Sequence, residues 1–158
     1  MARAGDDIEL AGTVLQYVLP TAAGATAVGH RDFKGLLEFG ESFALTEGAT
    51  YGLKYAINER RPNGGNYSFP SAHTSVSFCG AEFLRKRYGW VWGVPAYAAA
   101  SFVAYSRVES NNHWAWDVMG GAAVGIVSSY IFTRPYKGWN ITPEAGPGFW
   151  GVVVSRRW

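Results

Sequence analysis

The sequence predicts an all-α fold, a single-domain helical bundle of about five main helices. The chain has 158 residues, which is enough for one domain with a hydrophobic core and too few for two. Glycine and proline residues divide it into five segments of helical length. Strand patterns are weak until the C-terminal tail, so residues 1–158 are expected to form one domain.

The helical segments follow one another with short connections. The first contains Pro20, where a kink is expected. The second has apolar residues on one side and glutamates elsewhere, an amphipathic period. Ser71 is expected to cap the third helix, and Ser110, Asn111 or Asn112 the fifth. The five segments run near residues 6–28, 31–58, 71–88, 90–106 and 113–133.

The tail, residues 138–158, is rich in glycine and contains a short run of valines. It is expected to form a short packed strand or an irregular C-terminal extension. Its aromatic and basic residues leave contact with a membrane interface as a second interpretation.

Composition restricts the partners and the location. The net charge of +2 is too small to indicate a nucleic-acid partner. The two longest uncharged runs, residues 89–106 and 118–133, are shorter than the roughly 20 apolar residues of a spanning helix. The second helix also carries three glutamates, which are costly in lipid. A soluble or membrane-associated bundle is therefore favoured over a polytopic membrane protein.

Two cations lie at the end of the second helix. Lys54 and Arg61 are two helical turns apart, so both side chains can reach one point. Pro62 disfavours helical geometry at Arg61, which suits a side chain presented from a helix end into a pocket. Pairing of these cations with Glu47 or Glu59 on the surface is the structural alternative.

Two further clusters complete the pattern. The turn Pro70–His73 opens a helix whose unpaired N–H groups suit an anion. Arg107 follows Ser106, and His113 and Asp117 stand four residues apart on one helical face.

These residue types fit phosphoryl transfer. Three cations and a helix N-terminus can neutralise the charged oxygens of a phosphate. A neutral imidazole can attack phosphorus when a carboxylate holds its far nitrogen, and a second imidazole can protonate the leaving oxygen and then activate water. The sequence supplies each part: the cations Lys54, Arg61 and Arg107, the pair His113 and Asp117, and the second imidazole His73.

The order Lys-x6-Arg-Pro, Pro-Ser-x-His and Ser-Arg-x5-His-x3-Asp, over residues 54–117, resembles the three-part signature of the type-2 phosphatidic-acid phosphatase superfamily. That superfamily includes bacterial acid phosphatases, lipid phosphatases and vanadium haloperoxidases. The resemblance implies His113 as the nucleophile, Asp117 as its orienting group and His73 as the general acid. It also implies these phosphate ligands: Lys54, Arg61, Ser71, Arg107 and the backbone of Ala72 and His73.

The sequence departs from the family pattern in two places. Ala72 stands where the family usually has glycine, so a glycine-only backbone conformation is unavailable there. The connection between Pro62 and Pro70 is also shorter than is common, which narrows the rim of the expected pocket.

The expected function is metal-independent hydrolysis of phosphate monoesters or lipid (pyro)phosphates through a phosphohistidine, with no cofactor. A vanadium-dependent haloperoxidase, a non-catalytic module that binds phosphate or lipid head groups, and a transporter element are the alternatives. A zinc site at His73, His113 and Asp117 is disfavoured because the three cations would repel a metal ion.

The expected partner is a phosphorylated small molecule or lipid, with possible membrane-surface association; the sequence does not indicate the oligomeric state. The resemblance suggests a bacterial periplasmic protein, soluble or membrane-associated, or alternatively an inner-membrane protein with a periplasm-facing site. Trp114 and Trp116, which flank the site helix, are interpreted equally as a substrate wall or as packing residues.

Overall fold

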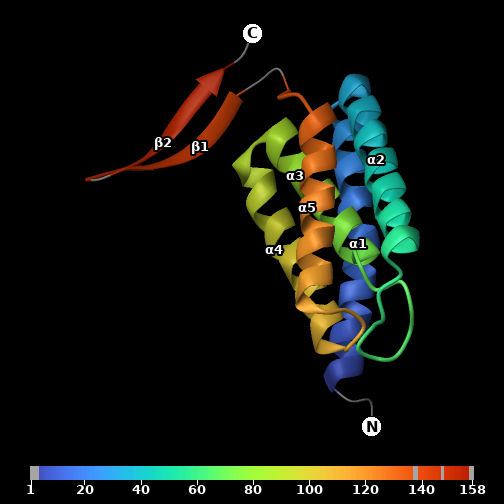
Figure 1. Cartoon of the computed structure of the whole chain (residues 1–158). Helices are drawn as coiled ribbons and strands as arrows, with labels where there is room; N and C mark the ends of the chain where they lie inside the picture. The colour runs from blue at the N-terminus through green and yellow to red at the C-terminus, as the bar shows by residue number, and fades with distance from the viewer. Residues whose placement is uncertain (1–3, 137–138, 147, 157–158) are drawn as a thin grey trace.

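The fold is a bundle of five helices followed by a β-hairpin (Figure 1). The structure is a computed structural model that describes residues 4–136, 139–146 and 148–156. The predicted all-α bundle is confirmed, and the tail adds a two-stranded sheet. The elements are α1 (Ala4–Gly29), α2 (Phe33–Ile57), α3 (Ala72–Tyr88), α4 (Trp90–Glu109), α5 (Ala115–Phe132), β1 (Trp139–Gly146) and β2 (Phe149–Arg156).

The helix ends are set by short polar side chains. Asp32 caps α2 by accepting a hydrogen bond from the N–H of Gly35 at 2.9 Å. Ser71 caps α3 as predicted, because its hydroxyl oxygen accepts from the N–H of Thr74. Helix α1 continues through Pro20, which lies in its interior.

The predicted cap of α5 is wrong. The N-cap residue is Trp114, and Ser110, Asn111 and Asn112 lie before it. The carboxylate of Asp117, in the first turn, accepts a hydrogen bond from the N–H of Trp114 at 2.8 Å. The start of α5 is therefore capped by the side chain of Asp117, which lies inside the helix, and not by a polar residue that precedes it.

Helix α3 is the central element and packs against all four other helices. It lies closest to α5, where Gly121 and Gly125 allow the two backbones to touch. An added Cβ would lie 2.5 Å from the carbonyl oxygen of Ser71 at Gly121, and 2.1 Å from that of Ser75 at Gly125. The two helices are thus joined at a contact that leaves no room for a side chain.

The hydrophobic core fills the part of the bundle farthest from the connection between α2 and α3. Phe83 is fully buried there, and its ring lies 4.9 Å from that of Phe39 and 5.9 Å from that of Tyr88. Small residues allow the helices to approach. The core residues are Leu19, Ala23, Ala27, Phe39, Cys79, Ala81, Phe83, Leu84, Ala96 and Ala100.

The tail forms an antiparallel hairpin that projects beyond the bundle (Figure 1). The N–H of Tyr136 donates to the carbonyl oxygen of Arg87 and fixes the chain just before it. Trp150 is 87% exposed, and Val152, Val153 and Val154 are also exposed. The predicted strand exists, and the hairpin contacts the bundle at α4, where Pro143 and Val152 lie beside Trp90 and Val94.

The outer surface of the bundle is apolar to an unusual degree, while hydroxyl groups lie inside. Ser42, Thr46 and Thr50 of α2 are fully buried. Among the described residues, α5 is the one helix long and apolar enough to cross a bilayer. Exposed apolar side chains of the other outer helices include Leu10, Val14, Val18, Leu36, Leu37, Leu45, Val91, Val94 and Phe102.

Candidate active site

The predicted site residues gather at one end of the bundle. Helix α2 ends there, α3 and α5 begin there, and the connection from residue 58 to 71 covers it (Figure 1). A cavity of about 310 Å³ opens among these elements. It is lined by Tyr51, Lys54, Tyr55, Arg61, Asn66, Tyr67, Ala72, His73 and His113.

His113 is held by Asp117. The imidazole Nδ1 lies 3.3 Å from the Oδ2 atom of Asp117, and both side chains are buried. That oxygen also accepts the N–H of Trp114, so the carboxylate is fixed with respect to α5. A proton on Nδ1 directed at the carboxylate leaves Nε2 unprotonated and available for attack.

Ser68 joins this pair and was missed by the sequence analysis. Its hydroxyl donates to Asp117 Oδ2 at 2.5 Å and lies 3.4 Å from His113 Nδ1. Ser68 is fully buried, and its N–H donates to the carbonyl oxygen of Glu59. A serine two residues before Pro70 gave no distinctive signal, because its position depends on how the connection folds back on itself.

The environment of His113 disfavours its charged form. Burial, with the nearby positive charges of Arg61 and Lys54, lowers the pKa of His113 to about 4, although Asp117 opposes the change. The imidazole is therefore neutral at physiological pH, as a nucleophile must be.

Lys54 and Arg61 supply positive charge without a carboxylate partner. The Lys54 ammonium donates to the carbonyl oxygens of Tyr67 and Ser68, at 2.8 and 3.3 Å. Arg61 Nε donates to the carbonyl oxygen of Asn66 at 3.2 Å. Neither cation forms an ion pair within the described part of the chain, which sets aside the surface pairing considered above. Their charge remains available to an anion.

Of the three predicted phosphate ligands at the start of α3, Ala72 and His73 line the cavity and Ser71 does not. Ala72 and His73 line the cavity. Ala72 has no left-handed backbone conformation, so alanine fits where the family usually has glycine. Ser71 is fully buried, accepts hydrogen bonds from Thr74 and donates its N–H to the carbonyl oxygen of Asp117. It connects α3 to α5 and does not line the cavity.

Arg107, expected as a phosphate ligand, is buried beside the cavity and is not among the residues that line it. The residue is 2% exposed, and its guanidinium donates to the backbone carbonyl oxygen of Glu9 at 2.5 Å. The Glu9 carboxylate is 3.9 Å away and also accepts from Asn112. Arg107 therefore ties α4 to α1 beside the site, and its charge acts on His73 without lining the cavity.

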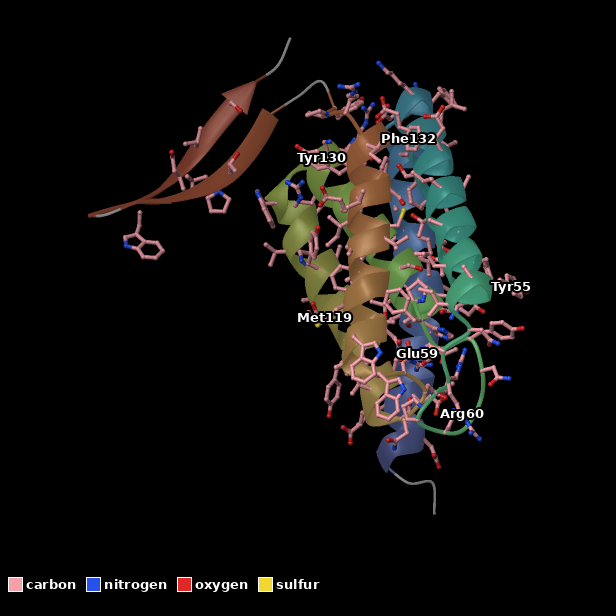
Figure 2. The ribbon with its side chains drawn as sticks, viewed as in Figure 1. Tyr55, Glu59, Arg60, Met119, Tyr130 and Phe132 are labelled. Carbon is pink, nitrogen blue, oxygen red and sulfur yellow. The ribbon has the colours of Figure 1, made fainter. Side chains whose placement is uncertain are left out.

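Trp114 and Trp116 attach the connection between α2 and α3 to the start of α5. Their rings stack 5.2 Å apart, and both are partly exposed. Trp114 Nε1 donates to the carbonyl oxygen of Arg60, and Trp116 Nε1 donates to the carboxylate of Glu59. Figure 2 shows Glu59 and Arg60 on the connection beside the start of α5. The pair holds the connection against α5, a role that neither interpretation of the sequence included.

The described residues contain no group of three or more His, Cys, Asp and Glu side chains placed to hold a metal ion. The cavity instead brings two imidazoles and two cations together, a set suited to binding an anion with a nucleophile and an acid at hand.

Comparison with known proteins identifies the family to which the chain belongs. The family model of the PAP2 superfamily matches residues 35–140, which include every predicted site residue. The chain belongs to the PAP2 superfamily. A lipid A 4'-phosphatase from Helicobacter pylori is 31% identical over 96% of this chain and 85% of its own length. The predicted enzyme class, a phosphatase, is confirmed.

Two solved structures share the PAP2 fold. Aquifex aeolicus LpxE superimposes with a TM-score of 0.67 over 78% of this chain and 83% of its own, at 21% identity. The Bacillus subtilis protein described as a transmembrane PAP2 type phosphatidylglycerolphosphate phosphatase gives 0.58 over 81% and 72%, at 26% identity. The helical bundle of this chain is therefore the PAP2 fold.

Proposed function

We propose that this PAP2 protein hydrolyses the phosphate monoester of a membrane lipid through a phosphohistidine on His113. The observation that carries the proposal is the pairing in one cavity of a buried, carboxylate-held imidazole with two cations that have no carboxylate partner. The phosphate occupies the cavity with its oxygens toward Lys54 and Arg61.

The first step transfers the phosphoryl group to the protein. His113 Nε2 forms a bond to phosphorus, and the bond from phosphorus to the ester oxygen breaks. Burial and the charges of Arg107, Arg61 and Lys54 disfavour a proton on His73 in the free protein, and the negative charge of the bound phosphate offsets them, so His73 is protonated in the complex. It gives this proton to the ester oxygen, and the leaving group departs as a neutral alcohol. Asp117, supported by the hydroxyl of Ser68, stabilises the positive charge that develops on the His113 ring.

The second step releases phosphate. His73, now neutral, takes a proton from water as the water oxygen bonds to phosphorus. The phosphorus–nitrogen bond breaks, and His113 returns to its starting state. The cations act in both steps because the negative charge of the phosphoryl oxygens persists throughout.

Trapping the intermediate tests this mechanism. The protein is mixed with p-nitrophenyl phosphate in EDTA and quenched in base, which preserves phosphohistidine. Mass spectrometry of the peptide then locates the phosphate. Because p-nitrophenolate leaves without an acid, His73→Gln should accumulate phosphate on His113, whereas His113→Gln should carry none.

Phosphate on another residue, or steady turnover in His113→Gln, would refute the mechanism. Phosphate binding without turnover of any ester would favour the binding module, and halide oxidation with added vanadate would favour the haloperoxidase.

A lipid substrate is supported by the outer surface. Leu37 and Val14 are 70% and 51% exposed on α2 and α1, and Met119 is 71% exposed on α5. Such a surface is stable in hydrocarbon and costly in water. This surface supports a location of the bundle within the bilayer, the alternative that the sequence analysis kept open. The lipid A phosphatase among the relatives agrees with a phosphorylated glycolipid substrate.

The basic residues at the two ends support an orientation of the bundle in the membrane. The end opposite the site carries four basic residues, Arg31, Lys34, Lys86 and Arg134, whereas the exposed or half-buried basic residues of the site-end connection are Arg60 and Arg61, of which Arg61 lines the cavity. Short segments rich in Lys and Arg remain on the cytoplasmic side of a membrane. The site therefore faces the periplasm.

Labelling tests the orientation. In a Cys79→Ser background, Asn63→Cys on the site-end connection and Arg31→Cys at the other end are exposed positions. A membrane-impermeant maleimide applied to cells with a permeabilised outer membrane should label the first and spare the second until lysis. The reverse pattern would place the site in the cytoplasm, and labelling of both would argue against a bilayer between them.

A further inference from the structure

A second cavity adjoins the phosphate cavity. It has a volume of about 330 Å³ and lies among α1, α2 and α3. Its walls combine aromatic rings and aliphatic groups with an amide and a carboxylate. The lining residues are Gln16, Tyr17, Pro20, Phe43, Glu47, Tyr51, Ala72, His73 and Val76.

The two cavities share one wall. Tyr51, Ala72 and His73 line both of them. If His73 protonates the leaving oxygen, that oxygen lies at this wall, with phosphorus on the side of His113. The remainder of the substrate then extends into the second cavity. What lines this cavity therefore determines which leaving groups are accepted.

Glu47 is the charged group of the second cavity. It stands seven residues before Lys54 on α2, about 10 Å along the helix axis. It is half-buried, and it has no hydrogen-bond or ion-pair partner among the described residues. Gln16 reaches the same cavity from α1. The cavity thus offers hydrogen-bond acceptors and negative charge, with aromatic rings around them.

This chemistry distinguishes two kinds of lipid phosphate. In a phosphate monoester of an acylated amino sugar, the leaving group is neutral and carries hydroxyl and amide N–H donors, which a carboxylate and an amide can bind. In a lipid diphosphate, the leaving group is itself a phosphate, and its negative charge would lie on the side of Glu47. Like charges at close range disfavour that complex.

We infer that Glu47, with Gln16, is a specificity-determining residue that selects a neutral, hydrogen-bond-donating leaving group of the sugar class and rejects lipid diphosphates. The inference rests on the proposed function, because it assigns the leaving-group side from the role of His73. In both cases the phosphorus–oxygen bond to the leaving group breaks and His113 receives the phosphoryl group; the leaving groups differ in charge.

The experiment compares two lipids on the same preparations. An acylated glucosamine monophosphate and a polyprenyl diphosphate are presented in detergent micelles, and the ratio of their kcat/KM values is measured. The ratio does not depend on the fraction of active protein. The wild type should prefer the monophosphate, and Glu47→Gln should lower the ratio by about tenfold, mainly through faster diphosphate hydrolysis.

Two further variants complete the test. Glu41→Gln removes an exposed carboxylate of the same helix and should leave the ratio unchanged. Gln16→Leu removes a donor and acceptor without changing charge, and should lower the ratio by a smaller factor, through weaker monophosphate binding. This variant also provides a readout if Glu47→Gln does not fold.

The inference is overturned if the wild type prefers the diphosphate, or if neither Glu47→Gln nor Gln16→Leu changes the ratio. It is equally overturned if Glu41→Gln has the same effect. In those cases phosphate release by the wild type shows that the proposed function still stands. Failure of the wild type to release phosphate from either lipid or from p-nitrophenyl phosphate would refute the proposed function, and this inference with it.

Discussion

Arg87 and Arg61 carry the same guanidinium at opposite ends of the bundle, and their partners differ. Arg87 is 5% exposed and bonds Asp32 through two nitrogens, at 2.5 and 2.6 Å. It also reaches Glu38 at 3.1 Å and the carbonyl oxygen of Arg134 at 2.7 Å. Arg61 has a single carbonyl partner, that of Asn66, and faces the cavity.

The comparison separates structural charge from functional charge. A buried guanidinium with two carboxylates is satisfied within the protein and joins α2 to α3. A guanidinium and an ammonium held by carbonyl oxygens keep their positive charge for an external anion. The two ends of the bundle therefore differ in how their basic residues are paired. We call the end with Arg87, whose charge is paired with carboxylates, the closed end, and the end with Arg61 and the cavity the open end.

The largest effect is expected from His113, the proposed nucleophile. His113→Ala should lower kcat by at least about 10⁴-fold, because in the proposed mechanism His113 accepts the phosphoryl group and its removal abolishes the first step. Release of phosphate from a lipid monophosphate in detergent measures it, and the melting temperature controls for folding. If His113→Ala retained a tenth of the wild-type kcat, His113 could not be the nucleophile.

The next effect is expected from Arg61, the arginine at the end that contains the cavity. Arg61→Gln should reduce kcat/KM by about 10²–10³-fold, because a charge-stabilising donor is lost from the phosphate. Its melting temperature should stay near that of the wild type, since no ion pair is broken. A loss of stability with little change in kcat/KM would mean that Arg61 is structural.

The matched change at the closed end should have the opposite profile. Arg87→Met leaves the carboxylates of Asp32 and Glu38 buried without their partner, which should lower the free energy of unfolding by about 3–5 kcal/mol. The kcat of the folded fraction should change much less than in Arg61→Gln. Thermal unfolding in detergent checks the first statement, and active-site titration of the remaining enzyme checks the second.

Ser68→Ala should have a moderate effect. Removing the hydroxyl takes one donor from Asp117, so the carboxylate orients His113 less well, and kcat should fall by about 10-fold. Ser42→Ala, which removes a buried hydroxyl of α2 that donates to the carbonyl oxygen of Glu38, is the control and should leave kcat unchanged. Equal effects in both variants would contradict a specific role for Ser68.

The smallest effect concerns pH. Because burial and the neighbouring cations lower the pKa of His113 to about 4, protonation should remove the nucleophile only in strong acid. The acid limb of kcat/KM, which reports the free enzyme, should fall with a midpoint near pH 4. Arg61→Gln removes a positive charge and should move this limb to higher pH. A shift to lower pH would contradict the assignment.

The sequence predicted the open end better than the closed end. The motif residues Lys54, His73 and His113 line one cavity, because cations, imidazoles and a helix start in fixed order can be recognised along the chain. The ion pairs of Arg87 join residues more than 45 positions apart, and no local pattern indicates such contacts. Their recognition required the packing of α2 against α3.

Other parts could not be predicted for similar reasons. Ser68 enters the site through the fold of a connection, and Arg107 is drawn inward by a backbone carbonyl of α1. The first turn of α5 is capped from within by Asp117, which a search for a polar residue before the helix does not find. The apolar outer surface was also hidden, because composition does not reveal which faces of the helices point outward.

The contact of Gly121 and Gly125 with α3 limits which positions of this enzyme can change during evolution. His113 and Asp117 lie at the start of α5, and His73 at the start of α3, so the separation of the proposed nucleophile and the proposed acid depends on how these two helices meet. No substitution at this seam adds a side chain without pushing them apart. Mutations that change substrate range are therefore expected to accumulate on α1 and α2, which line the second cavity, while the seam preserves the spacing that every substrate requires.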